Sequence, residues 1–220
     1  PACTVLAWLA AAPLLLAGCR AEAPRDAAPP PAIVDLGDPV EASDPQPVGG
    51  DTGLLVAPLG ELPAHWEFVE RSGATLTLGD LRGSFVVLDF VFTACPGPCP
   101  PMMGQMALLQ ERVRAMDDVR LLSISVDPEN DTPEALAEYG EAYGADPERW
   151  LLARMPIGFV NTLTRDELKL GDGGNPLAHS MKFVLVDREG RGRGFYDPLV
   201  DKGWIEKVLR DIEVLRAEGT

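Results

Sequence analysis

The sequence predicts an α/β domain in which helices cover a parallel or mixed sheet in three layers. Two observations lead to this prediction. Apolar runs rich in Val, Ile and Phe are typical of strands that are buried on both faces. Segments with apolar residues at helical spacing separate these runs, so strands and helices alternate before two final strands and a last helix.

The predicted elements follow one another from residue 75 onward. Turns rich in Gly and Asp are expected at 79–83 and 187–190. Pro133 fits the first turn of a helix that Asp131 or Thr132 would cap. We find no internal repeat. Strands are expected at 75–78, 85–92, 119–126, 181–186 and around 194–196, and helices at 103–116, 133–143, 161–170 and 205–215.

Residues 1–19 have the pattern of a secretory signal peptide. The apolar stretch from Thr4 to Gly18 is shorter than the roughly 20 residues that span a bilayer, and it fits the hydrophobic region of a signal. The sequence Leu-Ala-Gly-Cys that ends at Cys19 resembles a bacterial lipoprotein signal, in which this cysteine is lipidated. We expect this leader to be truncated, because the chain begins at Pro1 without an initiator Met or a basic stretch. The alternative is a buried helix of the domain.

Residues 20–60 read as a flexible linker, and residues 61–220 as the folded domain. The linker is rich in Pro, Ala, Gly and acidic residues. Such a composition cannot bury enough apolar surface to fold alone, and its prolines favour an extended spacer. We therefore expect the linker to hold the domain away from a membrane to which the lipid at Cys19 is anchored.

The charge and cysteine content narrow the possible functions. The formal net charge is −15, and no block of Lys and Arg is present, so nucleic acid is not expected as a partner. The cysteines are Cys3, Cys19, Cys95 and Cys99, of which only the last pair falls in the predicted domain. A single close pair closes too small a loop to stabilise a fold strongly. Redox chemistry or metal binding explains it better.

Cys95 and Cys99 stand four residues apart, between a predicted strand and a predicted helix. In a helix-like turn this spacing corresponds to about 6 Å along the axis, from a rise of about 1.5 Å per residue. Cα atoms of disulfides lie roughly 4.4–6.8 Å apart, so the pair can close or can stay open and hold a metal. The N-terminus of the helix is expected to lower the pKa values of both thiols. Pro96, Pro98 and other prolines stiffen the loop.

Several nearby residues have a structural interpretation beside a functional one. Met102, Met103 and Met106 carry thioethers, but we expect them to fill the core under the helix. His65 is interpreted as a surface or packing residue.

Three acidic residues also remain open in their roles. Asp89 stands in an apolar strand, where it is either buried with a raised pKa or placed at a polar edge. Asp127 and Asp131 precede a helix and could help to orient His179 or a partner. Helix capping and turn formation explain Asp131 just as well, so neither is assigned a catalytic role.

The chain resembles the Sco/SenC family of copper chaperones over residues 61–217. The resemblance implies a thioredoxin-like fold with a mixed central sheet, and copper ligands at Cys95, Cys99 and His179. In such a fold His179 would lie beside the dithiol. The family often has an acidic residue where this chain has Gly97. The resemblance rests on Thr-Ala-Cys-Pro-Gly-Pro-Cys-Pro at 93–100, Ser-Val-Asp-Pro-Glu-Asn-Asp-Thr-Pro at 125–133, and His-Ser at 179–180 before Phe-Val-Leu-Val-Asp at 183–187.

The ligand types favour copper over zinc. Two thiolates and one imidazole form a soft set that suits Cu(I) and can adapt to Cu(II). A structural zinc ion usually takes a fourth ligand. The predicted domain contains no third cysteine, and its other histidine is His65.

Three functions compete for the same dithiol. The first is a metallochaperone that, as the resemblance implies, delivers copper to the copper centre of cytochrome c oxidase subunit II or to another periplasmic copper protein. It would be a lipoprotein on the periplasmic side of a bacterial cell envelope. The second is a thiol–disulfide oxidoreductase that keeps the target cysteines reduced for metallation. The third is a peroxidase, against which the close spacing of Cys95 and Cys99 argues.

Overall fold

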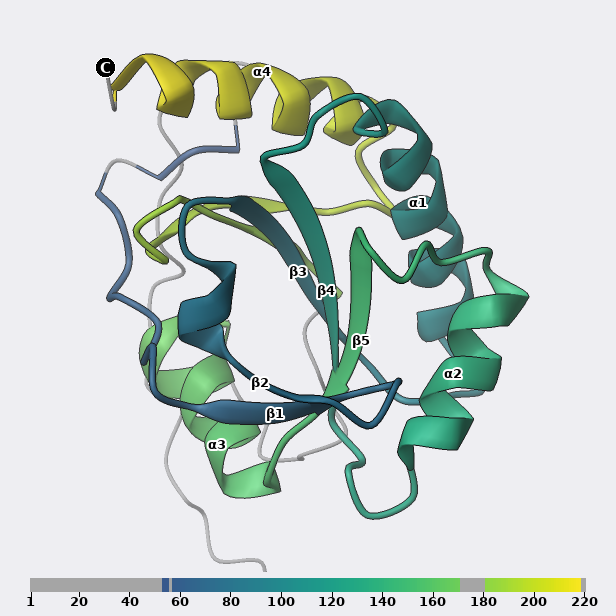
Figure 1. Cartoon of the computed structure of the whole chain (residues 1–220). Coiled ribbons are helices and arrows are strands. Elements are labelled where there is room, and N and C mark those ends of the chain that lie inside the picture. The colour runs from purple at the N-terminus through teal and green to yellow at the C-terminus, as the bar shows by residue number, and fades with distance from the viewer. Residues whose placement is uncertain (1–52, 56, 171–180, 219–220) are drawn as a thin grey trace, which may run out of the picture. The chain divides into compact units, whose positions relative to one another are not determined.

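The computed structural model describes residues 53–55, 57–170 and 181–218. They form a seven-stranded mixed sheet in the order β2-β1-β5-β4-β3-β6-β7 (Figure 1). The neighbours β3, β4 and β5 run parallel, while β1, β6 and β7 each pair antiparallel with a neighbour. The strands are β1 (Glu67–Glu70), β2 (Thr75–Thr77), β3 (Phe85–Val91), β4 (Val119–Ser125), β5 (Trp150–Arg154), β6 (Phe183–Val186) and β7 (Gly192–Tyr196).

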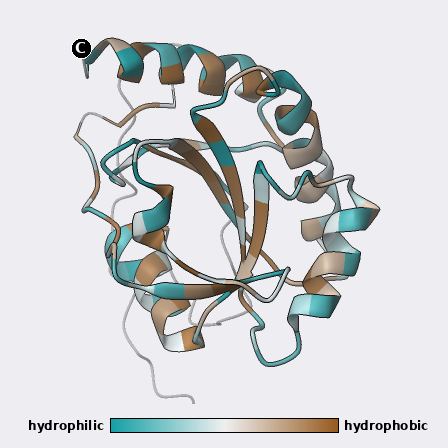
Figure 2. Cartoon of the chain, viewed as in Figure 1, coloured by the Kyte–Doolittle hydropathy of each residue, from teal (hydrophilic) through white to brown (hydrophobic). Residues whose placement is uncertain are grey.

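Helices lie on both faces of this sheet, which gives the three predicted layers. One core cluster joins one face of the sheet to residues of α1, α2 and α4. A second cluster joins the opposite face to α3 and its π-helical continuation, Leu163–Glu167. Figure 2 shows hydrophobic residues along the strands and alternating hydropathy along α4. The helices are α1 (Cys99–Arg112), α2 (Pro133–Ala142), α3 (Ile157–Thr162) and α4 (Trp204–Glu218), and a 3-10 turn spans Leu78–Leu81.

The predicted alternation of strands and helices is confirmed, with differences at two strands and at the ends of two helices. The strands β1 and β5 were not predicted, because each is short and neither alternates clearly between polar and apolar residues. The helix expected at 161–170 begins earlier, at Ile157, as α3 and continues as the π-helical segment to Glu167. The helix α1 spans Cys99–Arg112 rather than 103–116. It begins four residues earlier than expected because prolines are compatible with its first turn. Cys99 is therefore the first residue of the helix. Within the described residues, no helix has the length and apolarity needed to cross a bilayer.

Residues 53–55 and 57–62, here called the strap, run along the outer edge of β7. Leu55 N–H donates to the Arg193 carbonyl at 2.8 Å, and Leu59 N–H donates to the Gly192 carbonyl at 2.8 Å. The N–H of Gly53 donates to the buried carboxylate of Asp211 at 2.9 Å. Most of the strap falls within the segment that the sequence analysis assigned to the linker.

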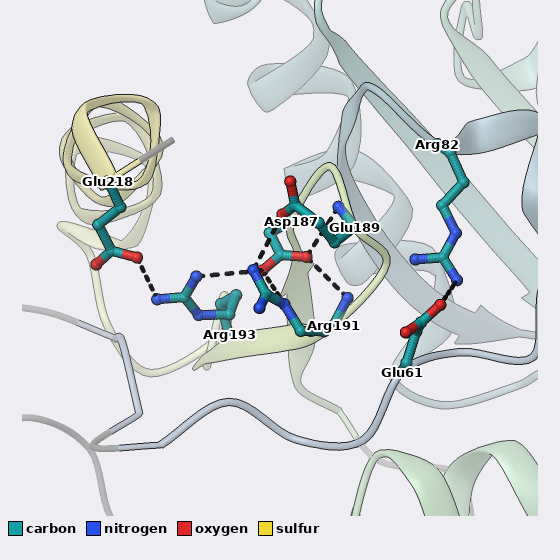
Figure 3. A network of polar contacts seen from close by, with 7 residues as sticks. All are labelled: Glu61, Arg82, Asp187, Glu189, Arg191, Arg193 and Glu218. Atoms are coloured by element: carbon teal, nitrogen blue, oxygen red, sulfur yellow. Dashed lines mark hydrogen bonds and ion pairs between the residues drawn. The ribbon is translucent and has the colours of Figure 1, made fainter. Parts of the chain in front are cut away.

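Ion pairs connect the β6–β7 hairpin with α4, and the strap with Arg82 (Figure 3). The buried Asp187 accepts from Arg191 at 2.9 Å and from Arg193 at 3.1 Å. Arg193 also reaches Glu218 of α4 at 2.7 Å. Separately, Arg82 pairs with Glu61 of the strap at 2.8 Å. Exposed pairs contribute little, so Asp187 is the main electrostatic anchor of this network.

Asp89 is a carboxylate in the middle of the apolar strand β3. It has no solvent exposure, and within the described part of the chain neither of its oxygens has a hydrogen-bond partner. The hydroxyl of its sheet neighbour Ser123 accepts from the Trp150 indole at 2.9 Å. Burial raises the pKa of Asp89 to about 7, although the nearby Ser123 hydroxyl opposes the shift. The prediction that Asp89 is either buried with a raised pKa or placed at a polar edge is resolved in favour of burial.

We expect Asp89 to make the metal-free, reduced domain less stable as the pH rises. Its pKa is about 7 in the folded state against 3.8 in the reference state, so its contribution is complete below about pH 4 and is lost as the pH rises through 7. The difference corresponds to a free energy of unfolding on the order of 4 kcal/mol. Asp89→Asn should therefore gain stability relative to wild type between pH 4 and 8, as measured by urea unfolding. Asp117→Asn, at a fully exposed position, is the control. If the free energies of unfolding of wild type and Asp89→Asn differed by the same amount at every pH, the expectation would be contradicted.

The strap should depend on the absence of a side chain at Gly53. A Cβ atom there would meet the ring of Tyr196 and would lie 2.8 Å from the Phe195 carbonyl oxygen. Gly53→Ala should therefore lower the free energy of unfolding by about 1–3 kcal/mol. At Gly104, in α1, an added Cβ meets nothing within 4 Å. Gly104→Ala should therefore raise the free energy of unfolding by up to about 1 kcal/mol. Equal effects of the two substitutions would show that the strap does not pack as described.

Candidate metal and redox site

The dithiol lies where β3 leaves the sheet and α1 begins. β3 ends at Val91, and Cys95 follows in a loop that reaches Cys99 at the start of α1. Cys99 is fully buried and Cys95 is 9% exposed. Both are thiols in the structure, and no disulfide joins them. Cys95 is thus the cysteine that solvent or a partner can reach more easily.

Prolines weaken the N-terminus of α1 as a site for negative charge. Pro98 is the N-cap and supplies no side-chain cap. Pro100 and Pro101, the next helical residues after Cys99, have no N–H group. Met102 N–H donates to the Pro98 carbonyl at 3.1 Å. The usual cluster of free N–H donors is therefore missing from this helix end.

The prediction that the helix lowers both thiol pKa values is wrong for Cys99. Burial raises the pKa of the Cys99 thiol to about 12. A hydrogen bond with the Cys95 thiol and the charges of Cys95 and Asp89 act in the same direction. Desolvation thus outweighs a helix end that has lost donors to proline. A metal that binds the thiolate of Cys99 must displace this proton, so binding is coupled to proton release.

Asp131 connects the loop to the rest of the domain. Its carboxylate accepts from the Thr93 hydroxyl at 2.6 Å and from the Thr93 N–H at 3.2 Å. It also accepts from the Ser125 hydroxyl at 2.5 Å. The cap of α2 is instead Thr132, whose hydroxyl accepts from the Ala135 N–H at 3.3 Å. Sequence reasoning did not assign this role, although Asp131 falls within a motif that it had singled out.

The structure confirms the packing interpretation of the methionines. Met102, Met103 and Met106 have no solvent exposure and belong to the core cluster under α1. His65 is exposed in the turn before β1, in agreement with a surface role. His179 and Cys19 lie outside the described residues. In the described part of the chain, no group of three His, Cys, Asp or Glu residues converges to hold a metal ion.

The chain segment around Cys95 carries no charged side chain of its own. The sequence from Val91 to Gln110 contains no Asp, Glu, Lys or Arg, in a chain with a net charge of −15. Ala94, Pro96 and Gly97 are exposed beside Cys95. Two largely buried thiols can hold a soft cation or can close to a disulfide.

Known proteins share this fold and much of the chain. A SCO1 protein homolog of Bacillus subtilis is 30% identical over 147 residues, which are 61% of this chain and 72% of the relative. A SCO1/SenC family lipoprotein from Bacillus anthracis is 29% identical, with a TM-score of 0.65 over 74% of this chain and 99% of that structure. The structure of BsSco, described as a Sco-family cytochrome c oxidase assembly protein with a disulfide switch, is 26% identical, with a TM-score of 0.63 over 74% of this chain and 96% of that structure.

More distant structures agree with the predicted thioredoxin-like fold. ScoI of Arabidopsis thaliana with copper bound is 23% identical, with a TM-score of 0.57 over 71% of this chain and 99% of that structure. At this identity the likeness concerns the fold alone. The family profile of SCO1/SenC matches residues 58–213, from the strap to α4. The chain therefore belongs to the SCO1/SenC family.

Proposed function

We propose that this protein is a copper metallochaperone. The observation that carries the proposal is the pair of neighbouring thiols, Cys95 and Cys99, reduced and held where β3 ends and α1 begins. Thiolates are soft ligands that suit Cu(I), whereas hard cations such as Mg²⁺ and Ca²⁺ prefer oxygen ligands. Copper is the cargo, and its transfer by exchange of ligands needs no net electron transfer.

His179 is proposed as the third ligand. β6 pairs antiparallel with β3, so β6 begins at the sheet edge where β3 ends. His179 precedes Phe183, the first residue of β6, by four residues. Four residues span at most about 14 Å, which is a distance compatible with an imidazole beside the thiols. A soft three-coordinate set of Cys95, Cys99 and His179 would then hold Cu(I) or Cu(II).

The proposed partner is the copper centre of cytochrome c oxidase subunit II, or another periplasmic copper protein. Support comes from BsSco, which belongs to a family described as cytochrome c oxidase assembly proteins. We further propose that Cys19 carries a lipid and anchors the chain on the periplasmic side of a bacterial cell envelope. The lipoprotein from Bacillus anthracis supports this anchor by likeness.

A thiol–disulfide oxidoreductase is the second candidate, favoured by the two reduced thiols and by the disulfide switch described for BsSco. In this reaction one thiolate of the pair attacks a disulfide of the partner, and the other thiol resolves the mixed disulfide. The partner gains two electrons and two protons and becomes a dithiol. Cys95 and Cys99 lose them and become a disulfide, so the atoms and electrons balance.

Copper stoichiometry separates the two candidates. Under anaerobic, reducing conditions we expect one tightly bound copper per chain, measured by elemental analysis after desalting. His179→Ala should lower copper affinity by at least about tenfold, because one of three ligands is lost, and it should leave dithiol exchange with a model disulfide unchanged. His65→Ala replaces the exposed histidine and should change neither property. Cys95→Ser should abolish both.

Two results would contradict the proposal. If wild-type protein retains no copper while exchange proceeds, the oxidoreductase is the better description. If copper affinity is equal in wild type and His179→Ala, the three-ligand site is wrong even if copper binds.

A further inference from the structure

We propose that Asp131 is a positioning residue for the dithiol, and that it sets both the copper affinity and the reduction potential of Cys95 and Cys99. The copper part of this inference rests on the proposed function, whereas the redox part needs only the two thiols. Asp131 is 1% exposed, and it lies in the loop between β4 and α2. It would act on the thiols through Thr93, two residues before Cys95.

The contacts of Asp131 hold Thr93 by both its backbone and its side chain. The carboxylate oxygens lie 3.2 and 3.3 Å from the Thr93 nitrogen, and the Thr93 hydroxyl donates at 2.6 Å. A residue held at both groups cannot rotate about its backbone without breaking a charge-assisted hydrogen bond. The direction in which the chain leaves Thr93 toward Cys95 is therefore fixed.

Residues of β4 and of the turn before α2 hold Asp131 in place. The Ser125 hydroxyl, at the end of β4, donates to Asp131 at 2.5 Å and accepts from the Asp127 N–H at 3.0 Å. The N–H of Asp131 donates to the Asp127 carbonyl at 2.9 Å. One buried side chain thus joins the ends of the parallel neighbours β3 and β4 and the turn before α2.

The loop that follows Thr93 has few donors with which to hold itself. Pro96 and Pro98 lack N–H groups, and the Cys95 N–H is bonded within the loop, to the Phe92 carbonyl at 3.2 Å. Cys99, in contrast, is fixed at the start of a fourteen-residue helix. The separation of the two sulfur atoms therefore depends on the path of the chain from Thr93 to Cys95.

Both reactions of the dithiol require the sulfurs to be close together. Copper binding brings two thiolates onto one ion, and oxidation forms one S–S bond while glutathione disulfide is reduced to two glutathione thiols. A loop that is already placed loses less entropy in either process. Loss of the Asp131 carboxylate should therefore weaken copper binding and disfavour the disulfide at the same time.

The test measures two quantities in Asp131→Ala and Asp131→Asn: the equilibrium of the pair with glutathione and the Cu(I) affinity in competition with a chromophoric chelator. We expect the equilibrium constant for disulfide formation to fall about tenfold, which makes the potential about 30 mV more positive for a two-electron couple. The Cu(I) affinity should fall at least about tenfold.

Two substitutions at Thr93 test the same contact if the Asp131 variants do not fold. Thr93→Ser keeps the hydroxyl and should behave like wild type. Thr93→Val keeps the shape and the backbone N–H but removes the hydroxyl donor, and it should shift the potential in the same direction as Asp131→Asn, by less.

Asp211→Asn is the matched control for a purely structural role. Asp211 is also 1% exposed and accepts from the Gly53 N–H and the Tyr196 hydroxyl, at 2.9 and 2.8 Å. This variant should lose stability but keep the wild-type potential and affinity. If the Asp131 variants, or Thr93→Val in their place, keep both properties as Asp211→Asn does, the positioning role is overturned. If wild type binds no copper, the proposed function fails, and the potential alone still decides the role of Asp131.

Discussion

The structure depends on the burial of β3 on both of its faces. All seven residues of this strand are buried, and it pairs with β4 in parallel over its whole length and with β6 on the other side. A strand in this position can end only by leaving the sheet at its carboxyl edge, where open α/β sheets place their sites. The dithiol loop occupies that exit, so a fully buried strand leads directly to the two thiols.

Two opposing effects act on the thiols at this exit. The start of a helix normally favours a thiolate, but here prolines take the place of N–H donors and Cys99 is fully buried. The balance favours the protonated thiol. The metal-free Cys99 thiol is thus protected from attack by oxidants that react with thiolates, and a soft cation would supply the charge that the helix end does not.

The sequence was sufficient for the order of most elements and for the placement of the thiols, because long apolar runs and helical spacing report burial directly. It was insufficient for β1 and β5, whose short strands are defined by their neighbours in the sheet. It also misjudged the pKa of Cys99, since helix position can be read locally but burial depends on the packing of distant elements. The bonds between Asp131 and Thr93 join residues 38 apart, which no local pattern shows.

The strap has a consequence for how the protein behaves at high concentration. An open sheet has two edges, and an unpaired edge strand can recruit a strand from another molecule. Here one edge strand, β2, has only three residues, and the other, β7, is covered by backbone bonds from the strap. Proteolysis on the carboxyl side of the strap would uncover the N–H and C=O groups of β7. Clipped protein should then be prone to aggregation even though the sheet, the helices and the dithiol are intact.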